Sequence, residues 1–141
     1  MTDTNFTAEE RAAMKERAKE VRSARRGAKA GDGEAEILAK IAEMAEPDRA
    51  IAERIHALVK ENAPGLTFRL WYGMPAYAGK GGKVVCFLQP AGKFKARYAT
   101  LGFNDDAQLD EGTVWPTAYA ITRLTADDEA RLAEVIRKAA G

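Results

Sequence analysis

Leu66-Thr67-Phe68-Arg69-Leu70-Trp71 is the stretch of sequence that decides the fold. Leu66, Phe68 and Leu70 alternate with Thr67, Arg69 and Trp71, and a hydrophobic period of two is typical of a half-buried strand. Upstream of this stretch the apolar residues recur at helical spacing. The change of period predicts that the chain passes from helices to a sheet at about residue 66.

Four more strands are predicted downstream, at residues 76–77, 83–89, 95–103 and 119–124. Gly81-Gly82 and Pro90-Ala91-Gly92 are turn sequences between them. Because the spacers are short, neighbouring strands are expected to run antiparallel.

Helices are predicted on both sides of the strands. Two amphipathic patterns cover residues 34–44 and 47–61, and a third begins at Thr125, which forms a capping-box pattern with Asp128. Helices at both ends of a strand run predict a two-layer α+β fold, with an antiparallel sheet from about residue 66 to 124 packed against them.

An N-terminal arm precedes this domain. Thr7 and Glu10 form a capping-box pattern, and a helix is predicted from Ala8 to about Ala30, where Gly31 and Gly33 are expected to break it. Met14 and Val21 are its large apolar side chains, so it is expected to lie solvated on the domain. The predicted organisation is an arm over residues 1–31 and an α+β domain over residues 32–141.

Composition narrows the function classes. The chain has 141 residues, a net charge of +1 and no apolar run long enough to span a bilayer. It shows no leader pattern, so a cytoplasmic location without a membrane partner is expected. Cys86 is the only cysteine and lies in an apolar run, where a buried thiol is expected.

Catalytic and zinc chemistry have few candidate residues. Ser23, His56 and Cys86 are each the only residue of their type, so no recognisable catalytic constellation and no zinc site of nitrogen and sulfur ligands is predicted. His56 lies beside the apolar stripe of its helix and is interpreted as a surface residue. These residue counts do not exclude an enzyme whose catalytic residues are Tyr, Lys, Asp or Glu. A non-enzymatic protein without a cofactor is nevertheless expected.

Two loops invite a ligand interpretation that their spacing does not favour. Residues 79–83, Gly-Lys-Gly-Gly-Lys, resemble a phosphate loop but lead into a strand, so a flexible hairpin turn is predicted. Asp105, Asp106, Asp110 and Glu111 crowd carboxylates into one loop without the spacing of an EF-hand, so a solvated acidic loop is predicted.

The positive functional signal is aromatic and basic. Residues 62–104 carry six basic side chains and no carboxylate, and aromatic residues cluster in the same stretch. Alternation sends neighbouring aromatic residues to opposite faces of a strand, so one set is expected to line a cleft beside the cations. The candidate ligand-binding residues are Trp71, Tyr72, Met74, Tyr77, Lys93, Lys95, Arg97 and Trp115.

Four sequence blocks carry a family resemblance: WYGMPAY from Trp71, GKVVCFL from Gly82, KFKARYATLGF from Lys93 and LDEGTVWPTAYA from Leu109. Together they resemble the YdhG-like family, known as domain of unknown function 1801, over about residues 34–140. The resemblance implies a compact bacterial α+β domain and, for some relatives, a frataxin-like role as an iron chaperone.

The residues favour a binding protein for a small anionic molecule or a peptide. An intracellular iron chaperone that uses surface carboxylates is the alternative, with iron as a possible ligand. Residues 32–61 are acidic, but Lys40, Arg49 and Arg54 interrupt the carboxylates of that segment. Nucleic acid is not expected as a partner because the net charge is near zero and no recognised motif is present. The sequence does not define the oligomeric state.

Overall fold

The computed structural model describes residues 7–25 and 30–141. Within them the chain forms four α-helices and one five-stranded antiparallel sheet, which confirms the predicted α+β fold. The helices are α1 (Ala8–Arg25), α2 (Ala30–Ala42), α3 (Asp48–Asn62) and α4 (Ala126–Ala140). The strands are β1 (Thr67–Trp71), β2 (Met74–Ala78), β3 (Val84–Gln89), β4 (Ala99–Phe103) and β5 (Ala118–Ile121), with short 3₁₀ turns η2 (Lys80–Gly82) and η3 (Gly92–Phe94).

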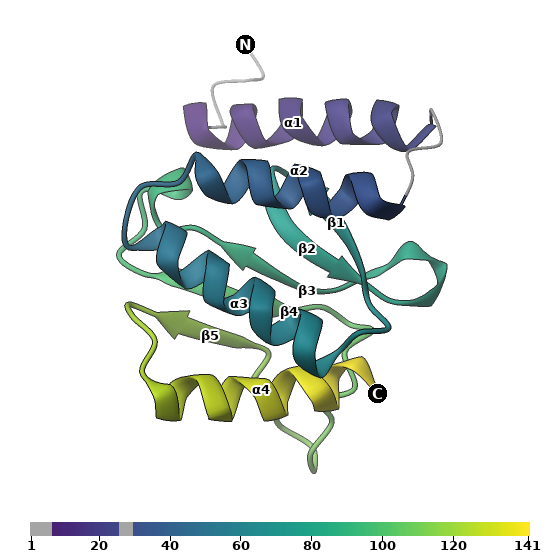
Figure 1. Cartoon of the computed structure of the whole chain (residues 1–141), viewed down its shortest axis with the longest axis vertical. Coiled ribbons are helices and arrows are strands. Elements are labelled where there is room, and N and C mark those ends of the chain that lie inside the picture. The colour runs from purple at the N-terminus through teal and green to yellow at the C-terminus, as the bar shows by residue number, and fades with distance from the viewer. Residues whose placement is uncertain (1–6, 26–29) are drawn as a thin grey trace.

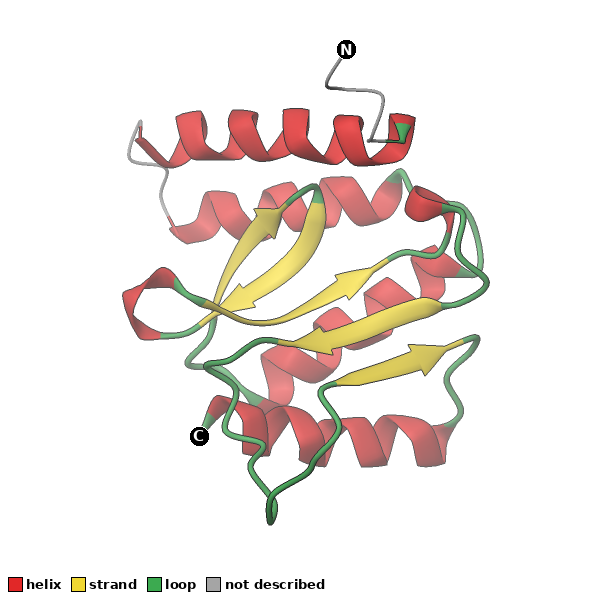
Figure 2. Cartoon of the chain, turned by 180° about the vertical axis from the view of Figure 1, so that it is seen from behind, coloured by secondary structure: helices red, strands yellow, loops and turns green. Residues whose placement is uncertain are grey.

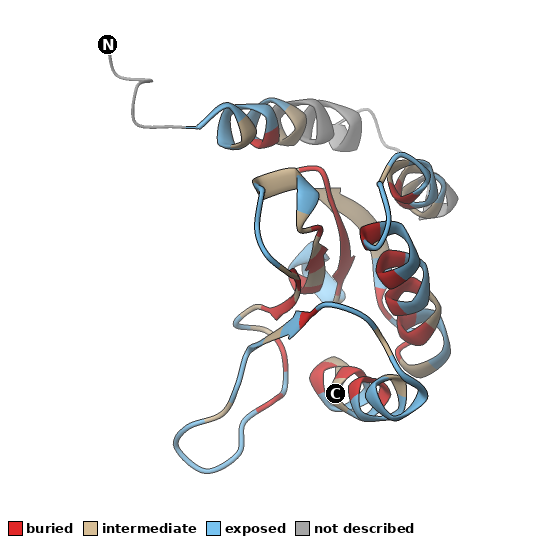
Figure 3. Ribbon diagram, turned by 90° about the vertical axis from the view of Figure 1, so that its left-hand side faces the viewer, coloured by how far each residue is buried: buried red, intermediate tan, exposed pale blue. Residues whose placement is uncertain are grey.

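The sheet is a meander in which each strand pairs with the next one along the chain, in the order β1-β2-β3-β4-β5. Helices α2, α3 and α4 cover one face, and the view from behind shows the strands of the other face (Figures 1 and 2). Helix α1 lies beside α2 and crosses the β1–β2 end of the sheet (Figure 3). The architecture is therefore two layers with an additional helix at one end.

The core lies between the sheet and its three covering helices (Figure 3). Ile37 of α2, Ile55 of α3 and Ile136 of α4 are fully enclosed there. Leu101 of β4 and Leu88 of β3 face each other in the pairing of these strands and pack in the same core. Burial of the apolar faces of α2, α3 and α4 against one face of the sheet supplies the main driving force for this arrangement.

The two capping boxes predicted from the sequence are present. Thr7 and Glu10 bond reciprocally at the start of α1, where the Glu10 amide donates to Thr7 Oγ1 at 3.0 Å. Thr125 and Asp128 do the same at α4. Each box satisfies two helix N–H groups that have no partner within the helix.

The predicted helix break at Gly31 and Gly33 is wrong, because α2 begins at Ala30 and runs through both glycines. Gly33 allows the close packing of α2 on β1: a Cβ at this position would lie 2.1 Å from the carbonyl oxygen of Phe68. Gly33 therefore allows close contact between the helix layer and the sheet, and it does not form a turn. Residues 26–29, where the predicted first helix continues, lie outside the described residues.

The predicted strand at 95–103 is too long at its start. The segment before Ala99 forms η3 and a turn, in which Lys95 takes a left-handed conformation with φ of 54°. A left-handed residue interrupts a strand, so β4 begins only at Ala99. This turn projects Lys93 and Phe94 toward the β1–β2 end of the sheet.

In the described residues, no helix combines the length and apolar character needed to cross a bilayer.

Candidate functional site

The tight turn between β1 and β2 is the centre of the candidate site. Trp71 pairs with Met74 across a two-residue loop, and Tyr72 and Gly73 both have positive φ angles, of 52° and 76°. Two positive φ angles are typical of a type I′ hairpin turn, whose twist matches that of the strands. Tyr72 adopts this conformation at a steric cost that glycine does not have. The turn thus presents a strained aromatic residue at the end of the sheet.

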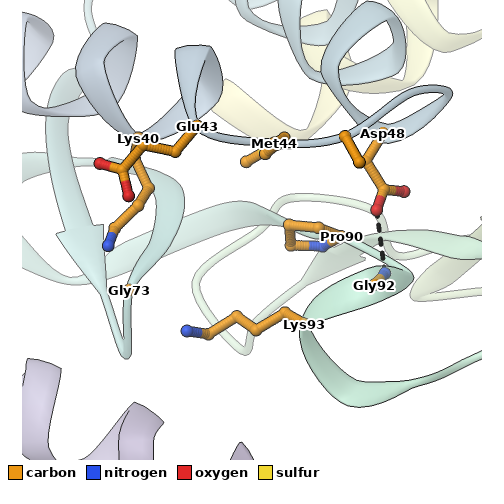
Figure 4. Close-up of a pocket in the computed structure, with 9 residues that line it drawn as sticks. Lys40, Glu43, Met44, Asp48, Gly73, Pro90, Gly92 and Lys93 are labelled. Atoms are coloured by element: carbon orange, nitrogen blue, oxygen red, sulfur yellow. Dashed lines mark hydrogen bonds between the residues drawn. The ribbon is translucent and has the colours of Figure 1, made fainter.

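Asp48 fixes the η3 turn next to this hairpin. It lies in the first turn of α3, is buried, and accepts hydrogen bonds from the backbone amides of Ala91 and Gly92 at 3.0 and 2.9 Å. Figure 4 shows the bond with Gly92. A carboxylate that accepts two amide hydrogen bonds holds the donor loop in one orientation. Helix α3 therefore determines where Lys93, the next residue, projects.

Two lysines converge on one carboxylate beside the hairpin. Lys40 of α2 and Lys93 of η3 point toward the same region next to Gly73 (Figure 4). Glu16 of α1 occupies that region: its Oε2 lies 3.2 Å from Lys40 Nζ and its Oε1 lies 3.4 Å from Lys93 Nζ. The carboxylate is thus held between cations of two different elements.

Gly73 lets the Glu16 carboxylate approach the hairpin backbone. A Cβ at Gly73 would lie 1.8 Å from Glu16 Oε2, so a side chain at this position would displace the carboxylate. The missing side chain, together with the positive φ, accounts for a glycine at this position. A cavity of about 330 Å³ adjoins it and is lined by Lys40, Glu43, Met44, Ala45, Asp48, Gly73, Pro90, Gly92 and Lys93. We call this space the Lys40/Lys93 cleft.

An aromatic surface lies on the other side of the hairpin. A second cavity, of about 360 Å³, is lined by Glu10, Ala13 and Met14 of α1 and by Trp71, Tyr72, Met74, Phe87, Gln89 and Phe94. The ring centroids of Trp71 and Phe87 are 5.1 Å apart. We call Trp71, Tyr72, Met74, Phe87 and Phe94 the aromatic shelf.

The shelf extends onto the sheet face that α2, α3 and α4 leave uncovered. Phe87 of β3 pairs with Gly102 of β4, and a Cβ at Gly102 would lie 2.3 Å from Phe87 Cζ. The Phe87 ring therefore lies across Gly102, and a larger residue there would push it off the sheet.

Helix α1 lines the shelf cavity and pairs with the two lysines of the cleft through Glu16. Ala13 is buried against the shelf, whereas Met14 remains 41% exposed. Glu9 pairs with Lys95 at 2.9 Å, which lowers the pKa of the Glu9 carboxyl and raises that of the Lys95 amine, mainly through their hydrogen bond. The arm was predicted to be a solvated helix, but its first half contributes one buried side chain and three ion pairs to the domain.

The structure brings together only part of the predicted ligand-binding set. Trp71, Tyr72 and Met74 lie on the shelf, with Lys93 in the adjoining cleft. Lys95 lies at the edge, paired with Glu9.

The other three predicted residues lie elsewhere. Tyr77 is completely buried on the helix-covered face of the sheet. Arg97 is exposed and lies over the ring of its neighbour Tyr98. Trp115 lines a separate cavity in the loop between β4 and β5, together with Asp105 and Asp110 of the predicted acidic loop.

The sequence did not identify Lys40 or Glu16 as site residues. Both lie outside the basic and aromatic stretch, and they reach the cleft only because α1 and α2 pack across the hairpin. No local pattern distinguishes them from other charged helix residues. Phe87 and Phe94 carried a recognisable signal, since both belong to the aromatic set of residues 62–104.

His56 was interpreted as a surface residue, and that interpretation is wrong. Its side chain is buried: Nδ1 lies 2.9 Å from Tyr77 Oη and Nε2 lies 2.8 Å from Glu34 Oε2. Glu34 also pairs with Lys60 at 2.8 Å. The pKa of Glu34 is lowered, first by the hydrogen bond from Lys60 and then by that from His56.

This buried network does not form a site for substrate. Tyr77 has no exposed surface, and burial raises the pKa of its hydroxyl far above its ordinary value. An aromatic cluster of His56, Phe68 and Tyr77 encloses the imidazole, with centroid separations from 5.2 to 5.9 Å. The network therefore joins α2, α3 and β2 in the core.

Metal binding has no assembled ligand set in the part of the chain that the structure describes. Within residues 7–25 and 30–141, no group of three or more His, Cys, Asp or Glu side chains is placed to hold a metal ion.

Comparisons of the chain with protein-family models, curated proteins and solved structures give no match. Membership of the YdhG-like family therefore remains a prediction from the four sequence blocks.

Proposed function

We propose that the protein binds a molecule carrying a carboxylate, either a small anion or an acidic peptide side chain, in the Lys40/Lys93 cleft beside the aromatic shelf. The observation that carries this proposal is the position of Glu16, whose carboxylate contacts both lysines next to Gly73. The cleft is thus complementary to a carboxylate, and α1 supplies one from within the chain.

The energetics allow a ligand to compete with Glu16. Ion pairs with solvent access each contribute about 0–1 kcal/mol, so the pairs of α1 with Lys40, Lys93 and Lys95 hold the helix weakly. A ligand at 100 times its dissociation constant stabilises the bound state by about 2.7 kcal/mol. The lysines orient the carboxylate, and apolar burial on the shelf supplies the remaining affinity.

The proposal predicts that Glu16 and the ligand exclude each other. The test uses the full chain carrying Trp115→Phe, which leaves Trp71 of the shelf as the only tryptophan. Citrate and a peptide with the sequence of residues 8–17 are titrated separately while Trp71 fluorescence is recorded. With Glu16→Ala added, at least one of the two probes should bind about tenfold more tightly than to the parent chain.

Two variants control for the site. Lys40→Ala together with Lys93→Ala, in the Glu16→Ala chain, should abolish the response. Lys15→Ala, which removes an exposed lysine of α1 without an ion-pair partner among the described residues, should leave it unchanged. A response that persists without Lys40 and Lys93, or no saturable response to either probe, contradicts the proposal. No structural observation favours the iron-carrier alternative, which remains a prediction.

A further inference from the structure

A large groove lies beside the last turns of α3 and α4 and the loop between β2 and β3. It has a volume of about 840 Å³ and shares no lining residue with the Lys40/Lys93 cleft or the cavity of the aromatic shelf. The last turns of α3 and α4 and the loop between β2 and β3 form its walls, and Figure 1 shows these three segments on one side of the molecule. A volume of this size is within the usual range of small-molecule sites, about 300–1,000 Å³.

Three cations from two separate parts of the chain line this groove. Lys80 and Lys83 come from the β2–β3 loop, and Arg137 comes from the last turn of α4. Both lysine side chains are exposed, and neither side-chain amine has an ion-pair or hydrogen-bond partner among the described residues. This separates them from Lys40, Lys93 and Lys95, which α1 already neutralises.

Hydrogen bonds hold the backbone of the lysine loop and the Arg137 guanidinium. Arg69 donates from Nη1 to the carbonyl oxygen of Gly82 at 3.0 Å, and the Gly79 amide donates to the Lys83 carbonyl at 2.9 Å. These bonds brace the loop that carries both lysines. The Arg137 guanidinium donates to Asn62 Oδ1, which ties it to the end of α3.

The remaining lining groups suggest the rest of the ligand. Asn62, Gln108 and Asp106 add amide and carboxylate groups that can bond with hydroxyls. Leu66 and Val85 add an apolar floor, and none of the described residues that line the groove has an aromatic ring on which a nucleobase would stack. Asp106 would repel an anion placed beside it, so the anionic end belongs with the three cations.

We infer that this groove binds a phosphorylated, hydroxyl-bearing metabolite of the sugar-phosphate class, with the phosphate among Lys80, Lys83 and Arg137. A phosphate monoester carries about −1.5 to −2 charge at neutral pH and three acceptor oxygens, enough for three separate cations. Because the lysines are exposed, salt weakens the attraction. This inference is independent of the proposed function, since the two sites have no residue in common.

The test is calorimetric titration of the full chain with ribose 5-phosphate, inorganic phosphate and ribose at low ionic strength. Both phosphate compounds should bind and compete with each other, whereas ribose alone should give no heat. Lys80→Ala combined with Lys83→Ala should weaken ribose 5-phosphate at least tenfold. Lys15→Ala on α1 removes one charge from a residue that does not line the groove, and it should leave the affinity unchanged.

A second readout locates the binding. In NMR spectra of a ¹⁵N-labelled chain, phosphate should shift the amide signals of residues 79–83. These shifts should be absent in the double lysine variant. The dispersion of the amide signals in the same spectrum shows whether that variant is folded. The inference fails if neither phosphate compound binds saturably, if the double variant binds as the parent does, or if Lys15→Ala weakens binding equally.

Discussion

His56 Nδ1 and Tyr77 Oη lie 2.9 Å apart inside the core, at a point where α3 meets β2. In the tautomer whose Nε2 donates to the Glu34 carboxylate, Nδ1 accepts from the tyrosine hydroxyl. The pair therefore satisfies two buried polar groups that water does not reach.

Tyr77→Phe should lower the free energy of unfolding by about 1–3 kcal/mol, because the buried Nδ1 atom of His56 loses its partner. Urea unfolding followed by circular dichroism measures the change. Tyr119→Phe is the matched control, since Tyr119 packs edge-on against Phe103 but its hydroxyl has no hydrogen bond among the described residues. Equal effects of the two variants would show that the His56 contact contributes nothing.

Glu34 should make stability depend on acid pH. Lys60 and His56 lower its pKa below the ordinary value of 4.5, so the folded state favours the ionised carboxylate. The resulting stabilisation is fully present above pH 4.5 and is lost as the pH falls toward the folded pKa. The difference in unfolding free energy between the parent chain and Glu34→Gln should therefore shrink below pH 4.5.

Urea titrations at several pH values test this dependence. Glu53→Gln, at an exposed position of α3 without an ion-pair partner among the described residues, provides the comparison. If the difference between the parent chain and Glu34→Gln stays constant through this range, Glu34 does not contribute in its ionised form.

Cys86 should be inert in the native chain. It is completely buried, and burial raises the pKa of its thiol to about 12, so thiolate is scarce at pH 8. A chromogenic disulfide reagent should react with it only as fast as the chain opens, and rapidly once the chain is unfolded in urea. Immediate reaction under native conditions would place the thiol at the surface.

The sequence predicted the features of the fold that depend on local pattern. The change of hydrophobic period at Leu66 located β1, and the reciprocal pattern of Thr125 and Asp128 located the start of α4. The errors arose where contacts distant in sequence override the local signal. Gly33 was taken as a helix breaker, but its role is to admit the Phe68 carbonyl, which lies on another element.

The candidate site was harder to predict for the same reason. The aromatic part could be anticipated, because Trp71, Tyr72 and Met74 are adjacent in sequence and flank a turn. Lys40 and Glu16 could not, because only the packing of α1 and α2 across the hairpin brings them to Gly73. Tyr77 was assigned to the cleft, although its position in the strand directs it to the opposite face from Met74.

Gly73→Ala should destabilise the protein and displace Glu16 from the cleft. Alanine is disfavoured at the φ of 76° that this position adopts, and its Cβ would collide with Glu16 Oε2. The first effect costs about 1 kcal/mol or more, as for other substitutions at positive φ. The collision with Glu16 adds to this cost only while α1 is packed on the hairpin.

Gly81→Ala separates these two effects. Gly81 has a similar φ of 82°, but a Cβ there would meet no atom within 4 Å. Each alanine variant is made alone and together with Glu16→Ala, which gives four proteins. Their free energies of unfolding are compared with those of the parent chain and of the Glu16→Ala single variant. Glu16→Ala should recover part of the loss caused by Gly73→Ala and none of the loss caused by Gly81→Ala. If the effects of Glu16→Ala and of the glycine substitution add at both glycines, Glu16 does not contact the hairpin in solution. The proposed function, which depends on that position of the carboxylate, would then lose its support.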